Sequence, residues 1–273
     1  MSYARNGILV RLTYLLVSFV IWFLSIGGYL FRSRKVVLCY HGIDDFSADA
    51  FRKQMRTISY RSLSLGAEST DNFKRFIRPA VVVTFDDAFE NLLCNALPVI
   101  NELNIPVSIY VVTGCLGSAP KWLLNSKHND EYEQLMSEEQ IKSLADNPLI
   151  TLGVHTHTHP KLTSLESESV RDELSESKRY LEKLIGRTVV SLAFPHGDFN
   201  ENVLHIAESS GLTQFLTLEE QMISAKQTEG KIGRFSMDPS VWPIEFRLTV
   251  DGAYSWLFYF RKIIRLVRRS VGK

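Results

Sequence analysis

Short apolar runs recur along the chain between residues 36 and 237, and segments with helical spacing separate most of them. The clearest run covers residues 81–83, where consecutive valines are typical of a strand buried on both faces of a parallel sheet. Similar runs predict strands over 36–40, 81–85, 106–113, 149–154, 188–194, 214–218 and 232–237. Because strands and helices alternate over this length, we expect an α/β fold whose parallel sheet closes, or nearly closes, into a barrel.

Helices are predicted between these runs. Apolar spacing supports helices over 51–58, 89–103 and 200–210, and Pro98 must kink the second of them or open a new turn inside it. Ser137 and Thr163 each begin a segment with the spacing of a capping box, which predicts the starts of two further helices. Gly186 predicts the end of the later one.

The N-terminal segment is different, because residues 12–31 contain no charged side chain. About 20 apolar residues match the length of a membrane-spanning helix and exceed the apolar core of a cleaved signal peptide. We therefore predict a single-pass transmembrane helix within a membrane anchor over 1–35. Arg11 precedes the segment and Arg32 follows it, with further basic residues on both sides, so the charges do not decide its orientation.

The C-terminal segment, 251–273, mixes apolar residues such as Trp256 and Phe260 with basic residues such as Arg261. This mixture predicts an amphipathic helix that lies on an anionic membrane surface. A helix packed on the barrel with a solvated basic side is the alternative. The chain is thus expected to contain an anchor over 1–35, an α/β domain over 36–250 and a basic amphipathic helix over 251–273.

Composition excludes several classes of protein. A formal net charge of +1 gives no general attraction to nucleic acid. The three cysteines include no C-x-x-C pair, which argues against a disulfide framework and against a thiolate zinc site.

Side chains suited to a metal site follow two of the predicted strands. Asp86 and Asp87 end the strand over 81–85, and His155 and His159 follow the strand over 149–154. Two imidazoles and one carboxylate leave coordination positions open, as a catalytic metal requires. The other aspartate would then act as a base on a water molecule, while His157 is expected to point away.

These segments resemble the motifs of the NodB-homology polysaccharide deacetylases, a family of metal-dependent carbohydrate de-N-acetylases and esterases. The family motif T-F-D-D-G reads T-F-D-D-A at 84–88, H-[ST]-x-x-H occupies 155–159, and the proline–aromatic–glycine turn reads F-P-H-G at 194–197. Residues 105–111 are also similar to the strand that follows the first motif, and the likeness covers roughly 36–240. The resemblance implies a distorted (β/α)7-type barrel, which together with the predicted anchor gives a NodB-like fold with an N-terminal transmembrane helix.

The resemblance also implies roles for the polar residues. Asp86 becomes the general base, and Asp87, His155 and His159 become the metal ligands. Zinc is the expected metal, with Co²⁺, Ni²⁺ or Mn²⁺ as alternatives in relatives. The metal would polarise the acetamide carbonyl and activate a bound water as nucleophile, while Asp86 removes the proton of that water.

The third motif implies an oxyanion and substrate-binding turn. Pro195 and His196 form its centre, and the backbone N–H of His196 lies where the family has an oxyanion donor. Ala88 departs from the family by replacing the glycine of the first motif, a mild change in backbone freedom.

Two further departures concern residues that orient the base and supply the general acid. No arginine lies between 189 and 194, where many members have one that orients the base, so Arg234 is the candidate for this role. No histidine follows His205, so the family's late general acid is absent. His41 is the replacement candidate and His196 the second.

The resulting prediction is a metal-dependent hydrolase of carbon–nitrogen bonds other than peptide bonds. It would remove N-acetyl groups from sugars of a polysaccharide or a lipid-linked oligosaccharide, at a bacterial inner (plasma) membrane, with the side of the membrane undetermined. Two alternatives stay open: an O-acetyl esterase that uses the same site, and a carbohydrate-binding pseudoenzyme, which the missing late histidine favours.

Overall fold

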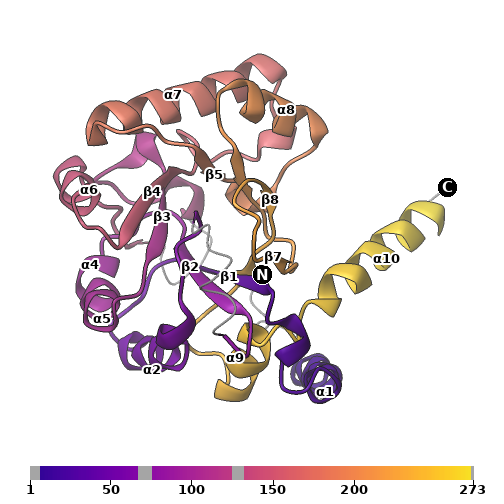
Figure 1. The fold of residues 1–273 in the computed structure, drawn as a ribbon. Helices are drawn as coiled ribbons and strands as arrows, with labels where there is room; N and C mark the ends of the chain where they lie inside the picture. Colours follow the sequence, from indigo (N-terminus) through magenta and orange to yellow (C-terminus); the bar gives the residue numbers. More distant parts are fainter. Residues whose placement is uncertain (1–6, 67–75, 125–131, 272–273) are drawn as a thin grey trace.

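The computed structural model describes residues 7–66, 76–124 and 132–271, and its centre is a nearly closed parallel sheet (Figure 1). Its strands follow one another in chain order from β1 to β6 and then β8. Their bounds are β1 Arg34–Tyr40, β2 Ala80–Phe85, β3 Val107–Val111, β4 Ile150–Val154, β5 Ser191–Ala193, β6 Gln214–Leu216 and β8 Gly230–Ile232. The prediction of an α/β barrel is therefore confirmed.

The barrel approaches closure through a strand that is broken in two. β8 pairs with β6, whereas β9 (Phe235–Ser236) pairs in parallel with β1. The two pieces are joined by Gly233 and Arg234, so the chain crosses from one end of the sheet to the other at this point. One short strand, β7 (Ile223–Ser224), adds an antiparallel pair to the start of β1.

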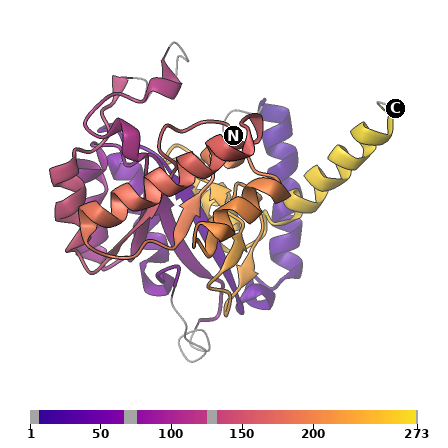
Figure 2. The same ribbon diagram turned by 90° about the horizontal axis from the view of Figure 1, so that it is seen from above.

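Helices cover the outside of the sheet (Figures 1 and 2). They are α2 Ala48–Ile58, α4 Leu92–Asn95, α5 Leu97–Leu103, α6 Glu138–Ala145, α7 Ser167–Ile185, α8 Glu201–Ser209 and α9 Pro243–Val250. Short 3₁₀ turns occur at η3 Ser59–Arg61, η4 Thr113–Cys115, η5 Lys121–Leu123, η7 Leu162–Ser164 and η8 Pro195–Gly197.

Local sequence signals explain most of these boundaries, with one error. Ser137 caps α6 in a reciprocal capping box with Gln140, and Pro98 opens α5 as expected. The capping box predicted at Thr163 is wrong. Its hydroxyl donates to Asp198 at 2.8–2.9 Å instead, and α7 begins at Ser167 after the uncapped Glu166.

Alternation along the strands separates two apolar regions. Val36, Leu38, Val81 and Val83 belong to the large core between the sheet and its helices. Val37 and Val82 belong to a smaller cluster with Tyr110, Ala193, Leu216 and Ile232, which come from the other strands. Side chains alternate along a strand. Thr84 and Asp86, two and four positions after Val82, therefore point into the barrel as Val82 does.

The N-terminal helix α1 (Ile8–Leu24) is shorter than the span expected over 12–31. The helix ends at Leu24 with Ser25 as its C-cap, because the next residues, Ile26, Gly27 and Gly28, adopt left-handed φ angles of 54°, 63° and 87° before the 3₁₀ turn η2 (Tyr29–Phe31). Across the described residues, no helix combines the length and the apolar character needed to cross a membrane, so the predicted transmembrane helix is not supported. At the other end of the chain, α10 occupies Trp256–Val271.

Candidate active site

Strand β2 delivers two acidic residues to the carboxyl end of the barrel. The backbone N–H of Asp86 still donates to Tyr40 O at 2.9 Å, so Asp86 continues the pairing of β2 with β1. Asp87 and Ala88 then take left-handed φ angles of 70° and 57°, which turns the chain sharply away from the strand. This turn gives the neighbouring carboxylates different surroundings.

Ala88 occupies a conformation that favours glycine. The left-handed backbone costs an alanine about 1 kcal/mol, but its methyl group is fully buried in the main core, which contributes about 0.8 kcal/mol. The two effects nearly cancel, which explains how this chain tolerates alanine at the position.

Asp86 forms a buried bidentate ion pair with Arg234. Arg234 Nη1 and Nη2 lie 2.6 and 2.8 Å from the two carboxylate oxygens, and Asp86 is 2% exposed while Arg234 is fully buried. The guanidinium is held in turn by Thr84 Oγ1 at 3.2 Å and by the carbonyl of Thr217 at 3.3 Å. The break between β8 and β9 thus brings Arg234 into contact with the end of β2.

This pair fixes the protonation of Asp86. Burial by itself would raise the pKa of the carboxyl, but the charge of Arg234 holds that pKa well below its ordinary value. Asp86 is therefore ionised at neutral pH. The same pairing outweighs burial at Arg234 and raises its pKa.

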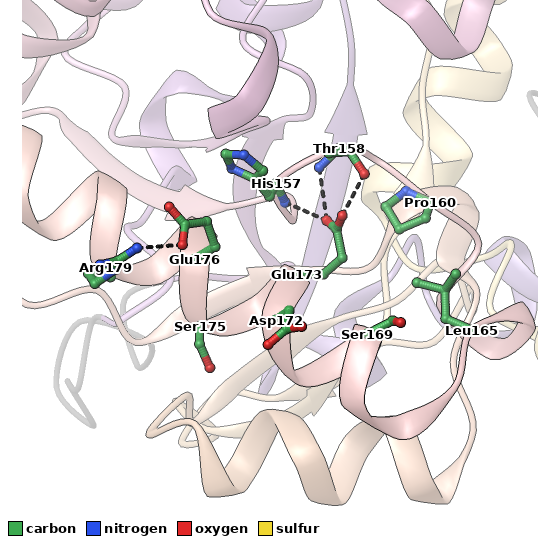
Figure 3. Close-up of a pocket in the computed structure, with 10 residues that line it drawn as sticks. All are labelled: His157, Thr158, Pro160, Leu165, Ser169, Asp172, Glu173, Ser175, Glu176 and Arg179. Carbon is green, nitrogen blue, oxygen red and sulfur yellow. Dashed lines mark hydrogen bonds and ion pairs between the residues drawn. The ribbon is translucent and has the colours of Figure 1, made fainter.

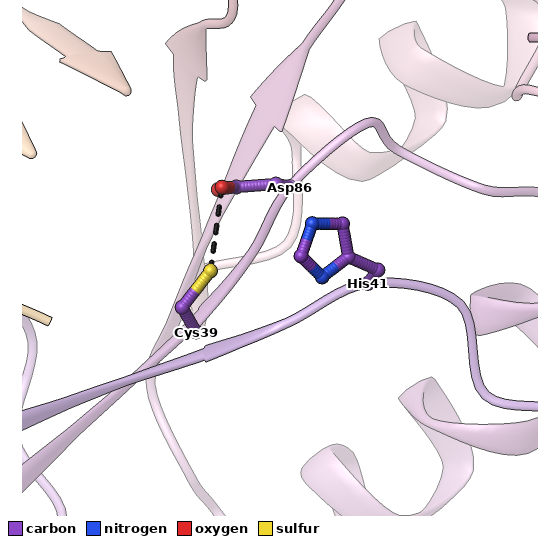
Figure 4. A group of neighbouring side chains, drawn as sticks. All are labelled: Cys39, His41 and Asp86. Atoms are coloured by element: carbon purple, nitrogen blue, oxygen red, sulfur yellow. Dashed lines mark hydrogen bonds between the residues drawn. The ribbon is translucent and has the colours of Figure 1, made fainter. Parts of the chain in front are cut away.

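Two residues of β1 and its following loop lie beside this carboxylate (Figure 4). Cys39 Sγ is 3.3 Å from Asp86 Oδ2, and burial raises the pKa of the thiol well above its ordinary value, so the thiol keeps its proton and donates it in a hydrogen bond. One ring nitrogen of the half-buried His41 lies within 4.8 Å of both the sulfur and a carboxylate oxygen.

Asp87 faces two imidazoles instead of an arginine. Asp87 Oδ1 lies 3.5 Å from His155 Nε2 and 3.4 Å from His159 Nε2. His155 Nδ1 is 2.7 Å from the carbonyl of Ala193, and because a carbonyl oxygen only accepts, this nitrogen carries the ring proton. Burial lowers the pKa of both histidines, so both rings are neutral near pH 7.

These donors fit a divalent metal ion. The neutral His155 directs the lone pair of Nε2 at a carboxylate oxygen, an arrangement that is repulsive unless a cation lies between them. Ligand atoms about 3.3 Å apart correspond to tetrahedral angles around an ion with bonds of about 2.0–2.1 Å, which matches the observed 3.4 and 3.5 Å. The hydrogen bond from His155 to Ala193 is the outer contact that fixes the tautomer of a metal-binding histidine.

The loop that holds both histidines is fixed from outside by α7 (Figure 3). Glu173 accepts hydrogen bonds from the backbone N–H groups of His157 and Thr158, each at 2.8 Å, and from Thr158 Oγ1 at 2.5 Å. The ring of His157 turns away from the metal-binding residues, with Nδ1 3.0 Å from Thr113 Oγ1. A groove of about 550 Å³ lies between this loop and α7.

Aromatic rings enclose the ring of His159. Trp122 stacks on it with ring centroids 4.1 Å apart, and His196 meets it edge-on at 4.7 Å. His196 has a φ of 58° within η8, directly after the buried Pro195. Burial, aided by the charge of Lys161, lowers the pKa of His196.

The structure therefore brings the sequence-predicted site residues together at one end of the barrel. Asp86, Arg234 and His41 form one group, and Asp87 with the two histidines forms the other, with Pro195 and His196 at their edge. Sequence reasoning missed the contacts of Cys39, Glu173 and Trp122. For these three residues the sequence pattern carries no signal of the contacts.

The sequence profile of the polysaccharide deacetylase family matches residues 74–215. The poly-β-1,6-N-acetyl-D-glucosamine N-deacetylase of Staphylococcus aureus is 24% identical over 218 residues, which cover 76% of this chain and 71% of that protein.

Two solved structures show the same fold. The Streptococcus pyogenes deacetylase PplD superposes with a TM-score of 0.63 at 21% identity, over 80% of this chain and 98% of that one. IcaB from Ammonifex degensii superposes with a TM-score of 0.62 at 20% identity, over 80% and 97% of the two chains. The profile match spans more than half of the sequence, and the chain is accordingly a member of the polysaccharide deacetylase family, hydrolases that act on carbon–nitrogen bonds other than peptide bonds.

Proposed function

We propose that this enzyme removes N-acetyl groups from a glucosamine-containing polysaccharide, with a metal held by Asp87, His155 and His159. The observation that carries the proposal is the contrast between adjacent aspartates: Asp86 is paired with Arg234, whereas Asp87 faces two neutral imidazoles. When bound, the metal supplies Lewis-acid polarisation of the acetamide carbonyl and acidifies the attacking water.

Asp86 then acts as the base. Its low pKa keeps the carboxylate ionised at neutral pH. A carboxylate of low pKa takes a proton only from an acidified donor, so its role depends on the neighbouring metal site. Arg234 holds both carboxylate oxygens and therefore fixes the direction in which Asp86 accepts the proton.

Two further steps need groups at the edge of the site. The developing oxyanion requires a hydrogen-bond donor, and we assign this to the backbone N–H of His196, whose ring contacts His159. The leaving amine requires a proton, and we assign its donation to His41, which lies next to Asp86. His196 is the second candidate for this donor.

The donor set and the relatives support a choice of metal and of substrate. Two imidazoles and one carboxylate at tetrahedral spacing favour zinc, with Co²⁺, Ni²⁺ or Mn²⁺ as substitutes. The Staphylococcus aureus relative is named for poly-β-1,6-N-acetyl-D-glucosamine, so we propose an N-acetylated glucosamine polymer as substrate and a lipid-linked oligosaccharide as the second choice. Residence at the plasma membrane of a bacterium stays a prediction.

The test is acetate release from β-1,6-linked N-acetylglucosamine oligosaccharides and from O-acetylated sugars. Protein stripped with a chelator should be inactive and should regain activity with added zinc. Asp86→Asn should abolish release, and Asp45→Asn, at a surface acid outside the site, should not. Release from the O-acetyl substrate alone would replace the proposal by an esterase. Oligosaccharide binding without any release would replace it by a carbohydrate-binding protein.

A further inference from the structure

Helix α1 turns Arg11, Ser18 and Trp22 towards the protein. Arg11 makes a partly buried bidentate ion pair with Glu245, and its Nε lies 2.7 Å from Glu245 Oε1. Trp22 Nε1 donates to Asp251 at 2.9 Å, and Ser18 Oγ accepts from Trp256 Nε1 at 3.0 Å. These contacts dock α1 against α9, the residue that follows it and the start of α10.

The opposite side of α1 is apolar and exposed. Leu9, Leu16 and Phe23 recur every seven residues and, with Leu24 and Ile26, are 65–77% exposed. Val10, Leu12, Phe19, Val20, Tyr29 and Leu30 extend the same surface and are 41–59% exposed. A helix of a protein surrounded by water buries its apolar side and exposes its polar side. α1 packs Tyr14, Leu15, Ile21 and Trp22 on the protein but also exposes a second apolar face, and this outer face is suited to an apolar environment.

Helix α10 begins against α1 and extends this surface. Trp256 packs edge-on against Tyr14, with ring centroids 5.5 Å apart. From there α10 projects away from the barrel in both views (Figures 1 and 2). Its side chains Tyr259, Ile263 and Leu266 are 55–61% exposed, and the basic Lys262 is exposed beside them. We call the outer face of α1, residues 26–34 and α10 together the apolar-basic surface.

Basic residues are concentrated towards the two ends of the chain. Arg11 and Arg261 among them pair with Glu245 and Glu220, and Lys35 is buried. Residues 1–43 and 252–273 contain 11 of the 31 Lys and Arg residues of the chain and none of its 30 Asp and Glu residues. The intervening residues 44–251 therefore carry a formal charge of −10. Arg32 and Arg34, directly after the exposed Tyr29 and Leu30, are themselves exposed. Positive charge therefore adjoins the exposed apolar side chains.

We propose that the apolar-basic surface inserts into the headgroup region of an anionic lipid bilayer. Apolar side chains enter the acyl boundary while the neighbouring basic groups contact anionic headgroups. A second copy of the chain is a poorer occupant, because a symmetric dimer would place like-charged surfaces against each other. The protein would thus lie on the membrane through the sides of its helices. This proposal is independent of the reaction at the barrel.

Co-sedimentation of the full-length protein with vesicles tests the proposal. Vesicles of phosphatidylcholine with 30% phosphatidylglycerol should bind the protein, and pure phosphatidylcholine should bind it more weakly. The double variant Leu16→Glu, Phe23→Glu should lower partitioning roughly 100-fold, at roughly tenfold for each large apolar side chain. Phe46→Glu is the matched control, since Phe46 is 98% exposed outside this surface. Unchanged thermal unfolding and near-UV circular dichroism would establish that the variants fold.

The remaining outcomes overturn the proposal. They are failure of the natural protein to bind either vesicle, or equal binding by the double variant. Light scattering during size-exclusion chromatography tests whether a second copy of the chain covers the surface instead. If the natural chain forms a dimer, the double variant does not, and neither binds vesicles, the surface is a self-association interface. Acetate release is not needed for any of these readouts, so their failure is distinct from failure of the proposed reaction.

Discussion

Replacing Arg234 by glutamine should strongly destabilise the protein. The change removes the guanidinium that pairs with both oxygens of Asp86 and leaves a carboxylate that is 2% exposed without its counter-charge. Breaking a buried ion pair from one side costs about 3–5 kcal/mol. A loss of this size is a large share of the 5–15 kcal/mol that typically stabilises a domain.

The size of the loss should depend on pH, and its sign follows from the pKa of Asp86. In the natural chain this pKa is depressed, so Asp86 stabilises the fold above its ordinary value of about 4 and loses this contribution only as the pH falls further. Without Arg234, burial raises the same pKa, and the variant must either protonate the group or bury its charge. The free energy lost should therefore be smallest near pH 4, where the variant can protonate the group, and should grow as the pH rises towards 7.

Urea unfolding of both proteins at several pH values between 4 and 7, with a chelator present throughout, measures this difference. Arg179→Gln is the matched control, because Arg179 is 75% exposed in its pair with Glu176 and should change stability by less than about 0.5 kcal/mol. A loss below about 1 kcal/mol at pH 7, or one that does not vary with pH, would refute this account of the Asp86–Arg234 pair.

Three further predictions concern the same end of the barrel. Glu173→Gln should weaken zinc binding about 10–100-fold in competition with a chelator, because Glu173 holds the loop between the metal-binding histidines. The control Glu176→Gln should leave zinc binding unchanged, and equal effects of the two variants would contradict the role of Glu173. Ala88→Gly should change the urea unfolding free energy by less than about 1 kcal/mol, since relief of backbone strain offsets the lost methyl group, and a larger shift would show that one effect dominates. Because burial lowers the pKa of His155 and His159, metal-free protein should lose stability as the pH falls below about 6.5. His159→Gln should reduce that loss, and an unchanged pH dependence of stability in the variant would contradict the burial of a neutral histidine.

The sequence predicted the barrel and the residues at its carboxyl end because both depend on local patterns. Strand ends were visible where apolar runs met polar residues, as at Asp86 and His155, and parallel strands bring such ends to one edge. Arg234 was assigned by resemblance, and the structure supplies the reason for its contact, which is the break between β8 and β9.

Other features depend on packing between distant segments and were not predictable in this way. Glu173 lies on a helix face that reads as solvated, and its three hydrogen bonds to the histidine loop follow only from the placement of α7. The helix α9 and the strand β7 were missed because both are short and carry no clear period. The N-terminal segment was read as a span from hydropathy alone, which does not show that its few polar residues dock on the barrel.

The most direct test of the proposed site compares Asp86→Asn with Asp87→Asn, measuring bound metal and acetate release on the same purified samples. The account predicts that Asp86→Asn retains metal near the level of the natural protein but releases no acetate. It predicts that Asp87→Asn loses both, since Asp87 Oδ1 lies next to both histidine nitrogens. Full metal content and turnover in Asp87→Asn, or loss of metal in Asp86→Asn alone, would contradict the assignment of base and ligand.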